Sequence, residues 1–526
     1  FGTARARARA RAPARARRAR RPGRLHPLYF PSFSCCTMGR FTSTALLGLA
    51  SGLALGVDIP HKTYECVDDV CAQQPPGTPA SASLSMEACA ITCGAGSLWP
   101  LPSGSYNFGG TLTPVSLDPS TVLITHTVPS AAAEAVLETM EDVFLDELAV
   151  IASRSSTASS ASGLPLRVNL DVADPGAVLT LASDETYSLT TTVEASYIMA
   201  SIVAPSVFGA RHGLTTVAQL IAANPAGANI VIASDVTITD DAPGFPYRGV
   251  LVDTGRHFMP ITQLRRTIDA MALNKMNSLH LHLSDTSAFP VELTSPLAQN
   301  VTNYGANSPD QYYSTMDIVD LVLYATARGV RIVPEVDVPA HTNQGWQWGA
   351  AAGLGDLLVC NDDAWTVKAL EPPSGQLNLA NENVYNVLEQ VYADVVALFS
   401  SDLHHLGGDE VIVGSDDTWA ACWNSTTAGA PIIAHLDTLG LDRAEPASFY
   451  ELWANFTARA AAAVGRAYDA APSDAPPLTK LIQWGGSETA PSAITYNLLA
   501  QDNVETVLPP DQFIIQVWDE LKDTIA

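Results

Sequence analysis

The chain has 526 residues, 47% of them hydrophobic, which is enough for more than one packed domain. Residues 1–56 contain eleven basic residues and no acidic ones, so the rest carries 17 basic and 54 acidic side chains, a net charge of −37. Such an acidic chain repels phosphate backbones, which argues against a nucleic acid partner. No uninterrupted apolar run reaches the roughly 20 residues that cross a bilayer. The composition therefore predicts a soluble protein without a membrane span.

The first residues of the chain do not look like part of a fold. Residues 1–37 lack a starting methionine, repeat Ala-Arg and contain ten arginines. This pattern is typical of translated non-coding sequence or, alternatively, of an Arg-rich transit peptide. Residues 38–56 resemble a secretory signal peptide, because Arg40 precedes an apolar run at Ala45–Leu55 and Gly56 ends a small-residue cleavage site. We expect a protein of the secretory pathway, secreted or lysosomal (vacuolar).

Six cysteines follow the leader, an even number that suits an oxidising compartment. Four of them lie within residues 57–96, which we interpret as a segment with two disulfides; three connectivities are open. These four are Cys66, Cys71, Cys89 and Cys93. Three N-x-S/T sequons predict glycosylation, at Asn300, Asn424 and Asn455.

Residues 97–240 predict a smaller α/β domain, because runs with strand and helix periodicity are interleaved there. The strand-like runs are Leu164–Val172, Thr186–Val193 and Ile230–Ala233, and the helical runs are Ala131–Ala152 and Val207–Ala222.

Residues 241–526 alternate short apolar runs with helical patterns, such as Leu264, Ile268 and Met271. Alternating strands and helices predict a parallel sheet with right-handed crossovers. In a (β/α)₈ barrel of the TIM type, the chemistry lies at the carboxyl ends of the strands, where polar or aromatic residues follow these runs. The runs are Tyr247–Asp253, Ser278–Leu283, Val330–Val338, Lys480–Gln483 and Phe513–Val517, and the residues that follow include Asp285, His341, Trp484 and Trp518.

The adjacent carboxylates Asp409 and Glu410 follow a Gly-Gly pair where another apolar strand ends. Taken alone, Asp-Glu is typical of a solvated acidic loop. Adjacent residues of a strand point to opposite faces, so both side chains can line one pocket only if the backbone turns at Gly408, which glycine permits.

Four ordered motifs between Tyr247 and Trp518 resemble those of glycoside hydrolase family 20, the β-N-acetylhexosaminidases. The motifs R-G-x-x-x-D-x-x-R, H-x-H-L-x-D, E-x-D-x-P-x-H and H-x-G-G-D-E correspond here to Arg248–Arg256, His280–Asp285, Glu335–His341 and His405–Glu410. The resemblance implies a (β/α)₈ barrel preceded by an α/β domain. It also implies an exo-acting enzyme that hydrolyses terminal β-linked N-acetylglucosamine or N-acetylgalactosamine of an oligosaccharide or glycoconjugate.

The resemblance implies substrate-assisted, retaining hydrolysis that needs no protein nucleophile and no cofactor. Glu410 would be the general acid and later the base for water, and Asp409 would orient the acetamide and stabilise positive charge on its nitrogen. Asp285 and His341 would fix Glu410 through a hydrogen-bonded relay. Arg248 would hold sugar hydroxyls; the alternative for this arginine is a salt bridge at the surface or at the bottom of the barrel.

The remaining assignments are balanced against structural roles. Trp484 and Trp518 would form apolar walls of the sugar pocket, although core packing explains a strand-end tryptophan about as well. His280 and His282 are interpreted as structural; no third ligand stands at convincing spacing, so we expect no metal. Cys360 and Cys422 resemble a family disulfide near the catalytic strand, the alternative being two buried free thiols. The resemblance also implies that the chain can form a homodimer.

The chain departs from the family pattern at two places. The family usually continues W-x-E after the fifth-strand tryptophan, whereas Trp484-Gly485-Gly486-Ser487-Glu488 stands here. The chain also ends at Ala526 after about six strands, which predicts a C-terminally truncated barrel with two open edges. Two alternatives therefore remain beside the enzyme: an inactive, sugar-binding homologue, and a barrel hydrolase that uses two separated carboxylates.

Overall fold

A computed structural model describes residues 62–75, 84–94, 96–108, 114–154, 163–173, 178–224, 229–361, 365–369, 372–411, 422–473, 475–485 and 508–517. Our predictions for the leader, for the signal peptide and for Trp518 fall outside these residues, and so does the departure at Gly486-Ser487-Glu488.

The cysteine-rich segment is a small hairpin joined to a short helix. Strands β1 (Tyr64–Val67) and β2 (Val70–Gln73) pair antiparallel, and helix α1 (Met86–Ala90) follows. Two disulfides link Cys66 to Cys93 and Cys71 to Cys89. The structure thereby selects one of the three connectivities that the sequence left open.

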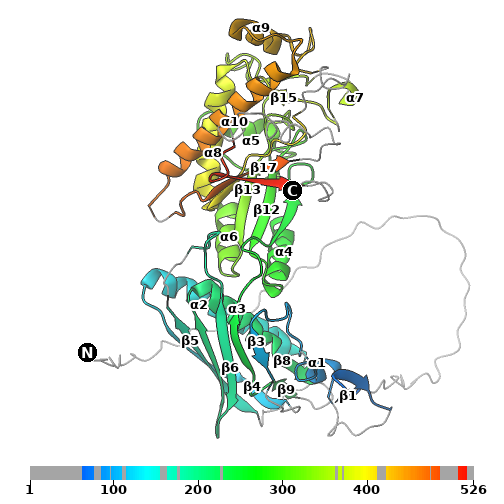
Figure 1. The fold of residues 1–526 in the computed structure, drawn as a ribbon, viewed down its shortest axis with the longest axis vertical. Coiled ribbons are helices and arrows are strands. Elements are labelled where there is room, and N and C mark those ends of the chain that lie inside the picture. The colour runs from blue at the N-terminus through cyan, green and yellow to red at the C-terminus, as the bar shows by residue number, and fades with distance from the viewer. Residues whose placement is uncertain are drawn as a thin grey trace, which may run out of the picture. The chain divides into compact units, whose positions relative to one another are not determined.

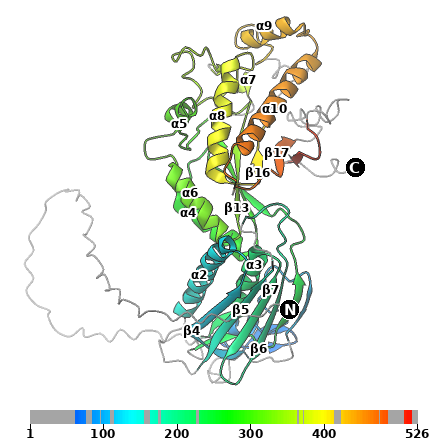
Figure 2. The same cartoon turned by 90° about the vertical axis from the view of Figure 1, so that its left-hand side faces the viewer.

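An eight-stranded mixed sheet follows, with strand order β3-β10-β6-β7-β5-β4-β9-β8. Helices α2 and α3 pack on the same face of this sheet, as Figures 1 and 2 show. The strands are β3 (Ser105–Asn107), β4 (Val115–Thr127), β5 (Leu164–Val172), β6 (Tyr187–Val193), β7 (Ile198–Ala204), β8 (Ile221–Asn224), β9 (Asn229–Ile232) and β10 (Thr237–Asp241), and the helices are α2 (Ala131–Ser153) and α3 (Val207–Gln219). This layered arrangement confirms an α/β fold for this part of the chain.

One predicted boundary is wrong. The helix expected to run to Ala222 ends at Gln219, and residues Ile221–Asn224 form β8, which pairs antiparallel with β9. An apolar run such as Ile-Ala-Ala fits helix and strand periods equally well, so pairing with a distant strand decides its conformation.

The second sheet has six parallel strands in chain order, β11-β12-β13-β16-β17-β18. The strands are β11 (Gly249–Asp253), β12 (Ser278–Ser284), β13 (Arg331–Val336), β16 (Leu403–His405), β17 (Lys480–Gly485) and β18 (Phe513–Val517). Helices lie between most successive strands: α4 (Ile261–Leu273), α5 (Ala298–Gly305), α6 (Thr315–Thr326), α7 (Trp365–Lys368), α8 (Glu382–Phe399), α9 (Ala430–Leu439) and α10 (Pro446–Asp469), and a short ribbon is formed by β14 (Leu358–Val359) and β15 (Gln376–Leu377). This order confirms the predicted alternation and is that of a barrel of the (β/α)₈ type.

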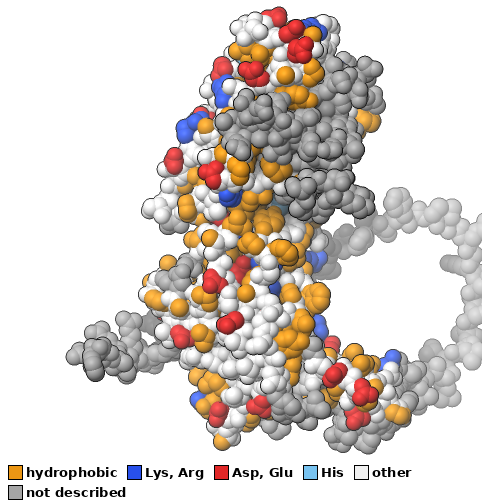
Figure 3. Space-filling model, in the orientation of Figure 1, with side chains coloured by type: hydrophobic (Ala, Val, Ile, Leu, Met, Phe, Trp, Pro, Cys, Tyr) orange, Lys and Arg blue, Asp and Glu red, His pale blue; other side chains and the backbone are white. Residues whose placement is uncertain are grey.

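Each sheet has its own hydrophobic core. The helical pattern Leu264, Ile268 and Met271 is buried against the parallel sheet, as predicted. Charged side chains are scattered over the face shown in Figure 3 and do not gather in one patch. Within the described ranges, no helix is long and apolar enough to cross a membrane.

Candidate active site

The carboxyl ends of the parallel strands bring together polar side chains that are distant in sequence. Asp253 ends β11, Asp285 follows β12 directly, His341 lies beyond β13, and Asp409 with Glu410 lies beyond β16. Neighbouring parallel strands end at the same edge of a sheet. The predicted site residues Asp285, His341, Asp409 and Glu410 therefore meet at this edge.

A sharp turn after β16 presents both adjacent carboxylates. Gly407 and Gly408 have φ angles of +67° and +84°, and Glu410 has +52°, a left-handed conformation that is uncommon outside glycine. The turn is fixed by Asp337, whose Oδ1 accepts a hydrogen bond from the Gly408 N–H at 2.8 Å. The side chains of Asp409 and Glu410 keep 17% and 20% of their surface exposed, so both remain accessible to a small ligand.

A series of close contacts between charged groups reaches Glu410 from the neighbouring strands. The Nε2 atom of His341 lies 3.2 Å from Oε2 of Glu410, and its Nδ1 atom lies 3.3 Å from Oδ2 of Asp285. Burial alone would lower the pKa of His341, but the carboxylates around it, Asp409 and Asp337 first, raise it well above its usual value. The structure thus brings Asp285 against His341 and His341 against Glu410, and the roles of these residues stay a prediction.

An arginine at the site is Arg256, to which the sequence analysis gave no role. Its Nη2 atom lies 3.0 Å from Oδ2 of Asp285, and its Nη1 atom lies 2.7 Å from Oδ2 of Asp253. Burial would raise the pKa of Asp285, but hydrogen bonds from His282 and His341 and the charge of Arg256 hold it well below its usual range. Arg256 lies three residues past the end of β11, and this position after a strand could have identified it from the sequence.

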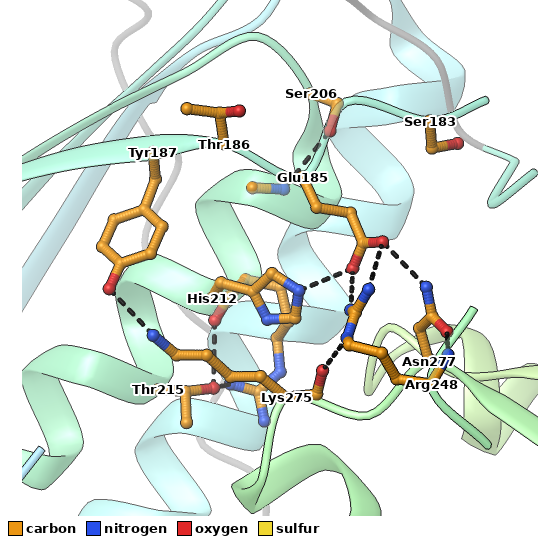
Figure 4. Close-up of polar contacts among 12 residues, drawn as sticks. Ser183, Glu185, Thr186, Tyr187, Ser206, His212, Thr215, Arg248, Lys275 and Asn277 are labelled. Atoms are coloured by element: carbon orange, nitrogen blue, oxygen red, sulfur yellow. Dashed lines mark hydrogen bonds and ion pairs between the residues drawn. The ribbon is translucent and has the colours of Figure 1, made fainter. Parts of the chain in front are cut away.

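The structure contradicts the expectation that Arg248 lies with these residues. Arg248 precedes β11 and so lies at the opposite, amino end of the sheet. Its guanidinium donates to both oxygens of Glu185, with Nη1 at 3.2 Å from Oε1, and to the carbonyl of Lys275 (Figure 4). It also donates to the carbonyl of Phe245. The alternative of a salt bridge at the bottom of the barrel is the one that the structure supports.

Glu185 is the centre of a buried polar cluster that joins the two sheets. It precedes β6 and accepts hydrogen bonds from Asn277 Nδ2 at 2.8 Å and from Arg248, and lies 2.7 Å from His212 Nε2 (Figure 4). Burial opposes ionisation of Glu185, but the hydrogen bonds and charges of His212 and Arg248 outweigh it and lower its pKa to about 2. These contacts hold the first sheet against the amino end of the second.

Replacing Glu185 with Gln is expected to cost roughly 3 kcal/mol of unfolding free energy at pH 7, because Arg248 loses its buried partner. The folded-state pKa is depressed from 4.5 to about 2, so the wild-type advantage should be full above pH 4.5 and disappear as pH falls through 2. Urea unfolding of both proteins across this range measures it. Glu389→Gln, which breaks an exposed pair with Arg466, is the control and should cost less than about 1 kcal/mol; equal losses would contradict a buried cluster.

Trp484 is almost fully buried, with 8% of its surface exposed. Its Nε1–H donates to Oε1 of Glu335 at 2.6 Å, and its ring packs on His280 and His405. Core packing therefore explains this tryptophan, and a role as a wall of the sugar pocket also keeps support because Trp484 lies on β17, the neighbour of β16.

The interpretation of His280 and His282 as structural fits their contacts. His280 Nε2 and His282 Nδ1 lie 2.7 and 2.9 Å from Oε2 of Glu335. In space, His405 joins His280 and Glu335, with one nitrogen or oxygen of each within 4.8 Å, so a third group of metal-ligand type does exist. However, His405 Nδ1 accepts a hydrogen bond from the Gly407 N–H, and both Glu335 oxygens face N–H donors, so these atoms already have partners. His280 Nδ1 and His405 Nε2 have no hydrogen-bond partner among the described residues. The absence of a metal stays a prediction.

The loops near the site are linked by the third disulfide. Cys360 and Cys422 are both buried and form the bond that the resemblance implied. Of the sequon asparagines, Asn455 is exposed on α10, whereas Asn300 and Asn424 are partly buried and Asn424 donates to the Arg443 carbonyl. Glycosylation at the three sites stays a prediction.

Comparison with known proteins agrees with this geometry. Residues 245–525 match the catalytic domain of glycosyl hydrolase family 20, and residues 98–220 match a domain described as beta-acetyl hexosaminidase like. The chain is 34% and 35% identical to the chitooligosaccharidolytic beta-N-acetylglucosaminidases of Ostrinia furnacalis and Bombyx mori, over 83% of this chain and 67% of each of those proteins.

A solved structure, the exo beta-N-acetylglucosaminidase of Vibrio harveyi, shares the fold with a TM-score of 0.55 and 24% identity. The match covers 81% of this chain and 58% of that one, so this chain spans little more than half of the bacterial structure and about two thirds of the insect proteins. The family match extends over more than half of the residues and includes every strand of the parallel sheet. The chain therefore belongs to glycosyl hydrolase family 20.

Proposed function

We propose that the protein is an exo-acting β-N-acetylhexosaminidase that removes terminal non-reducing N-acetylhexosamine by substrate-assisted, retaining hydrolysis. The observation that carries this proposal is the turn at Gly407-Gly408, after which the carboxylates of Asp409 and Glu410 lie 3.8 and 3.2 Å from the same nitrogen, Nε2 of His341. Two relatives are named beta-N-acetylglucosaminidases, which supports an N-acetylhexosamine substrate.

Glu410 would act first as an acid and then as a base. In its protonated form it gives its proton to the glycosidic oxygen while the bond from this oxygen to the anomeric carbon breaks. The carbonyl oxygen of the sugar's own acetamide forms the new bond to that carbon, which gives an oxazolinium ion. Glu410, now a carboxylate, removes a proton from the water that opens this ring, so the acid is regenerated and the configuration is retained.

Asp409 would hold the acetamide during these steps. The acetamide nitrogen becomes positively charged as its carbonyl oxygen attacks, and a carboxylate beside the N–H stabilises that charge. The two adjacent side chains therefore have different tasks: Glu410 moves protons and Asp409 orients the acetamide. His341 and Asp285 keep Glu410 in place through contacts of 3.2 and 3.3 Å.

Arg256 is the better candidate than Arg248 for binding sugar hydroxyls. Its guanidinium lies at the carboxyl edge of the sheet, keeps 36% of its side-chain surface exposed, and is oriented by Asp253 and Asp285. A planar guanidinium with several donors suits a pair of hydroxyl groups. Trp484 supplies an aromatic surface for the acetamido methyl, and Trp518 remains a prediction outside the described residues.

The sharpest test compares two substrates that differ only in the acetamide. The protein should release 4-nitrophenol from the β-N-acetylglucosaminide and leave the matching β-glucoside uncleaved, because the nucleophile belongs to the substrate. Asp409→Asn should lower kcat on the acetamido substrate by about 10²–10³-fold. Cleavage of both substrates at similar rates would indicate a protein nucleophile and a two-carboxylate hydrolase, and no cleavage by the folded protein would overturn the proposal.

Three disulfides in the described residues support maturation in the secretory pathway, where oxidising conditions preserve such bonds. Secretion and lysosomal delivery share this route, and either would expose the enzyme to oligosaccharides and glycoconjugates. Substrate competition will measure the preference between N-acetylglucosamine and N-acetylgalactosamine. Light scattering will measure whether the protein forms a homodimer.

A further inference from the structure

A carboxylate that the mechanism above does not use lies at the centre of the parallel sheet. Glu335 on β13 has no exposed surface, yet N–H groups of two other strands face its two oxygens. His280 Nε2 lies at 2.7 Å and His282 Nδ1 at 2.9 Å from Oε2, and Trp484 Nε1 donates to Oε1 at 2.6 Å. A buried carboxylate with this many donors stays ionised, and its pKa lies well below its usual range because the histidine charges outweigh burial.

His282 connects this carboxylate to the proposed catalytic relay. Its Nδ1 atom lies 2.9 Å from Oε2 of Glu335, and its Nε2 atom lies 3.3 Å from Oδ2 of Asp285. A neutral imidazole has one N–H, whereas the imidazolium has two, so only the protonated ring can donate to both carboxylates. Burial disfavours this charge, but Glu335 and Asp285 outweigh burial and raise the pKa of His282.

The contacts between these side chains form one continuous series. From Trp484 it passes through Glu335, His282, Asp285 and His341 to Glu410, and its successive contacts are 2.6, 2.9, 3.3, 3.3 and 3.2 Å. Carboxylates and imidazoles alternate between the two ends, so the charges of neighbours are opposite. Other titratable groups that face these contacts are Tyr247, Arg256, His280, Asp337, His404, His405 and Asp409, whose Oδ2 lies 3.8 Å from Nε2 of His341.

We propose that Glu335 and His282 are positioning residues that link the acid Glu410 to the pocket wall Trp484. This inference rests on the proposed function, because it concerns the same site. Glu335 orients the indole ring by accepting the hydrogen bond of the Trp484 N–H. His282 supplies the positive charge that holds Asp285 in place, and Asp285 in turn holds Glu410 through His341. Neither residue needs to touch the sugar.

The electrostatic end of the link is tested by His282→Gln. Loss of the His282 cation makes the surroundings of Asp285 more negative, so the protonated, active form of Glu410 should persist to higher pH. The alkaline limb of the pH profile of kcat/KM should therefore shift to higher pH. We expect kcat to fall by about 100-fold, the size of a modest displacement of a catalytic group. In the double variant Glu335→Gln/His282→Gln one negative and one positive charge are both absent, so the limb should return toward its wild-type position although kcat stays low.

The indole end is tested by a double-mutant cycle on KM. Glu335→Gln should raise KM for the 4-nitrophenyl β-N-acetylglucosaminide several-fold, because the wall of the pocket loses its anchor. In a Trp484→Phe background, which has no N–H to anchor, the same substitution should leave KM nearly unchanged, since contacting residues are not additive. Additive effects on KM would overturn the link to Trp484.

A matched control is available on β16. His404 is fully buried like His282, but neither of its ring nitrogens has a hydrogen-bond partner among the described residues, and burial lowers its pKa to about 3. His404→Leu should therefore keep both kcat and the alkaline limb. Two results would show that these residues are only structural and would overturn the proposal. One is an alkaline limb of folded His282→Gln at the wild-type pH; the other is a double variant whose limb coincides with that of His282→Gln. An inactive wild-type protein would instead refute the proposed function itself.

Discussion

Glu410→Gln is expected to lower kcat on a β-N-acetylhexosaminide by about 10²–10⁴-fold, the usual contribution of a positioned general acid. The amide is nearly the same size and can keep the contact with His341, but it can neither give a proton to the glycosidic oxygen nor take one from water. KM should change little, because Glu410 acts on the bond that breaks. Steady-state kinetics on an alkyl β-N-acetylglucosaminide, whose leaving group requires protonation, measures this loss.

The leaving group separates acid catalysis from simple damage to the pocket. 4-Nitrophenolate leaves without much help, whereas an alkyl alcohol requires protonation, so the variant should lose far more activity on an alkyl β-N-acetylglucosaminide. Glu451→Gln, at an exposed glutamate of α10, should leave both rates unchanged. Equal losses on the two leaving groups would contradict the role of Glu410 as the acid.

Gly407→Ala is expected to lower kcat by about 100-fold or more, because the turn that carries both carboxylates cannot keep its shape. A Cβ atom at this position would lie 2.0 Å from Oδ1 of Asp337 and 2.4 Å from its Cα atom. Residue 407 also has φ of +67°, which costs an alanine of order 1–3 kcal/mol. The chain must therefore move Asp409 and Glu410, and thermal unfolding together with kcat should report both consequences.

Gly440 provides the matched control for this substitution. Its φ angle is +70°, but an added Cβ atom would meet nothing within 4 Å, since the residue caps α9 at the surface. Gly440→Ala should therefore show the backbone cost alone, with unchanged kcat. If Gly407→Ala behaves like Gly440→Ala in both measurements, the contact with Asp337 does not shape the site.

Much of the catalytic edge could be predicted because its information is local. Asp285 directly follows an apolar run and His341 lies a few residues past another, and parallel strands bring such positions to one edge whatever the details of packing. The Gly-Gly pair before Asp409 predicts a turn from backbone sterics alone. The motif contains both Arg248 and Arg256 and does not distinguish them, but Arg248 precedes β11 and Arg256 follows it, so only Arg256 lies at the catalytic edge.

Three features could be predicted from the sequence alone: the alternation of strands and helices, the edge that carries the acids, and the number of cysteines in the disulfide-linked segment. They depend on the period of the side chains and on residues close together in the chain. Folding was needed to establish the cysteine pairing, the ion pair of Arg248 with Glu185, and the contact of Trp484 with Glu335 across 149 positions. Strand order and register fix such long-range contacts, and a single sequence does not encode them in any local pattern.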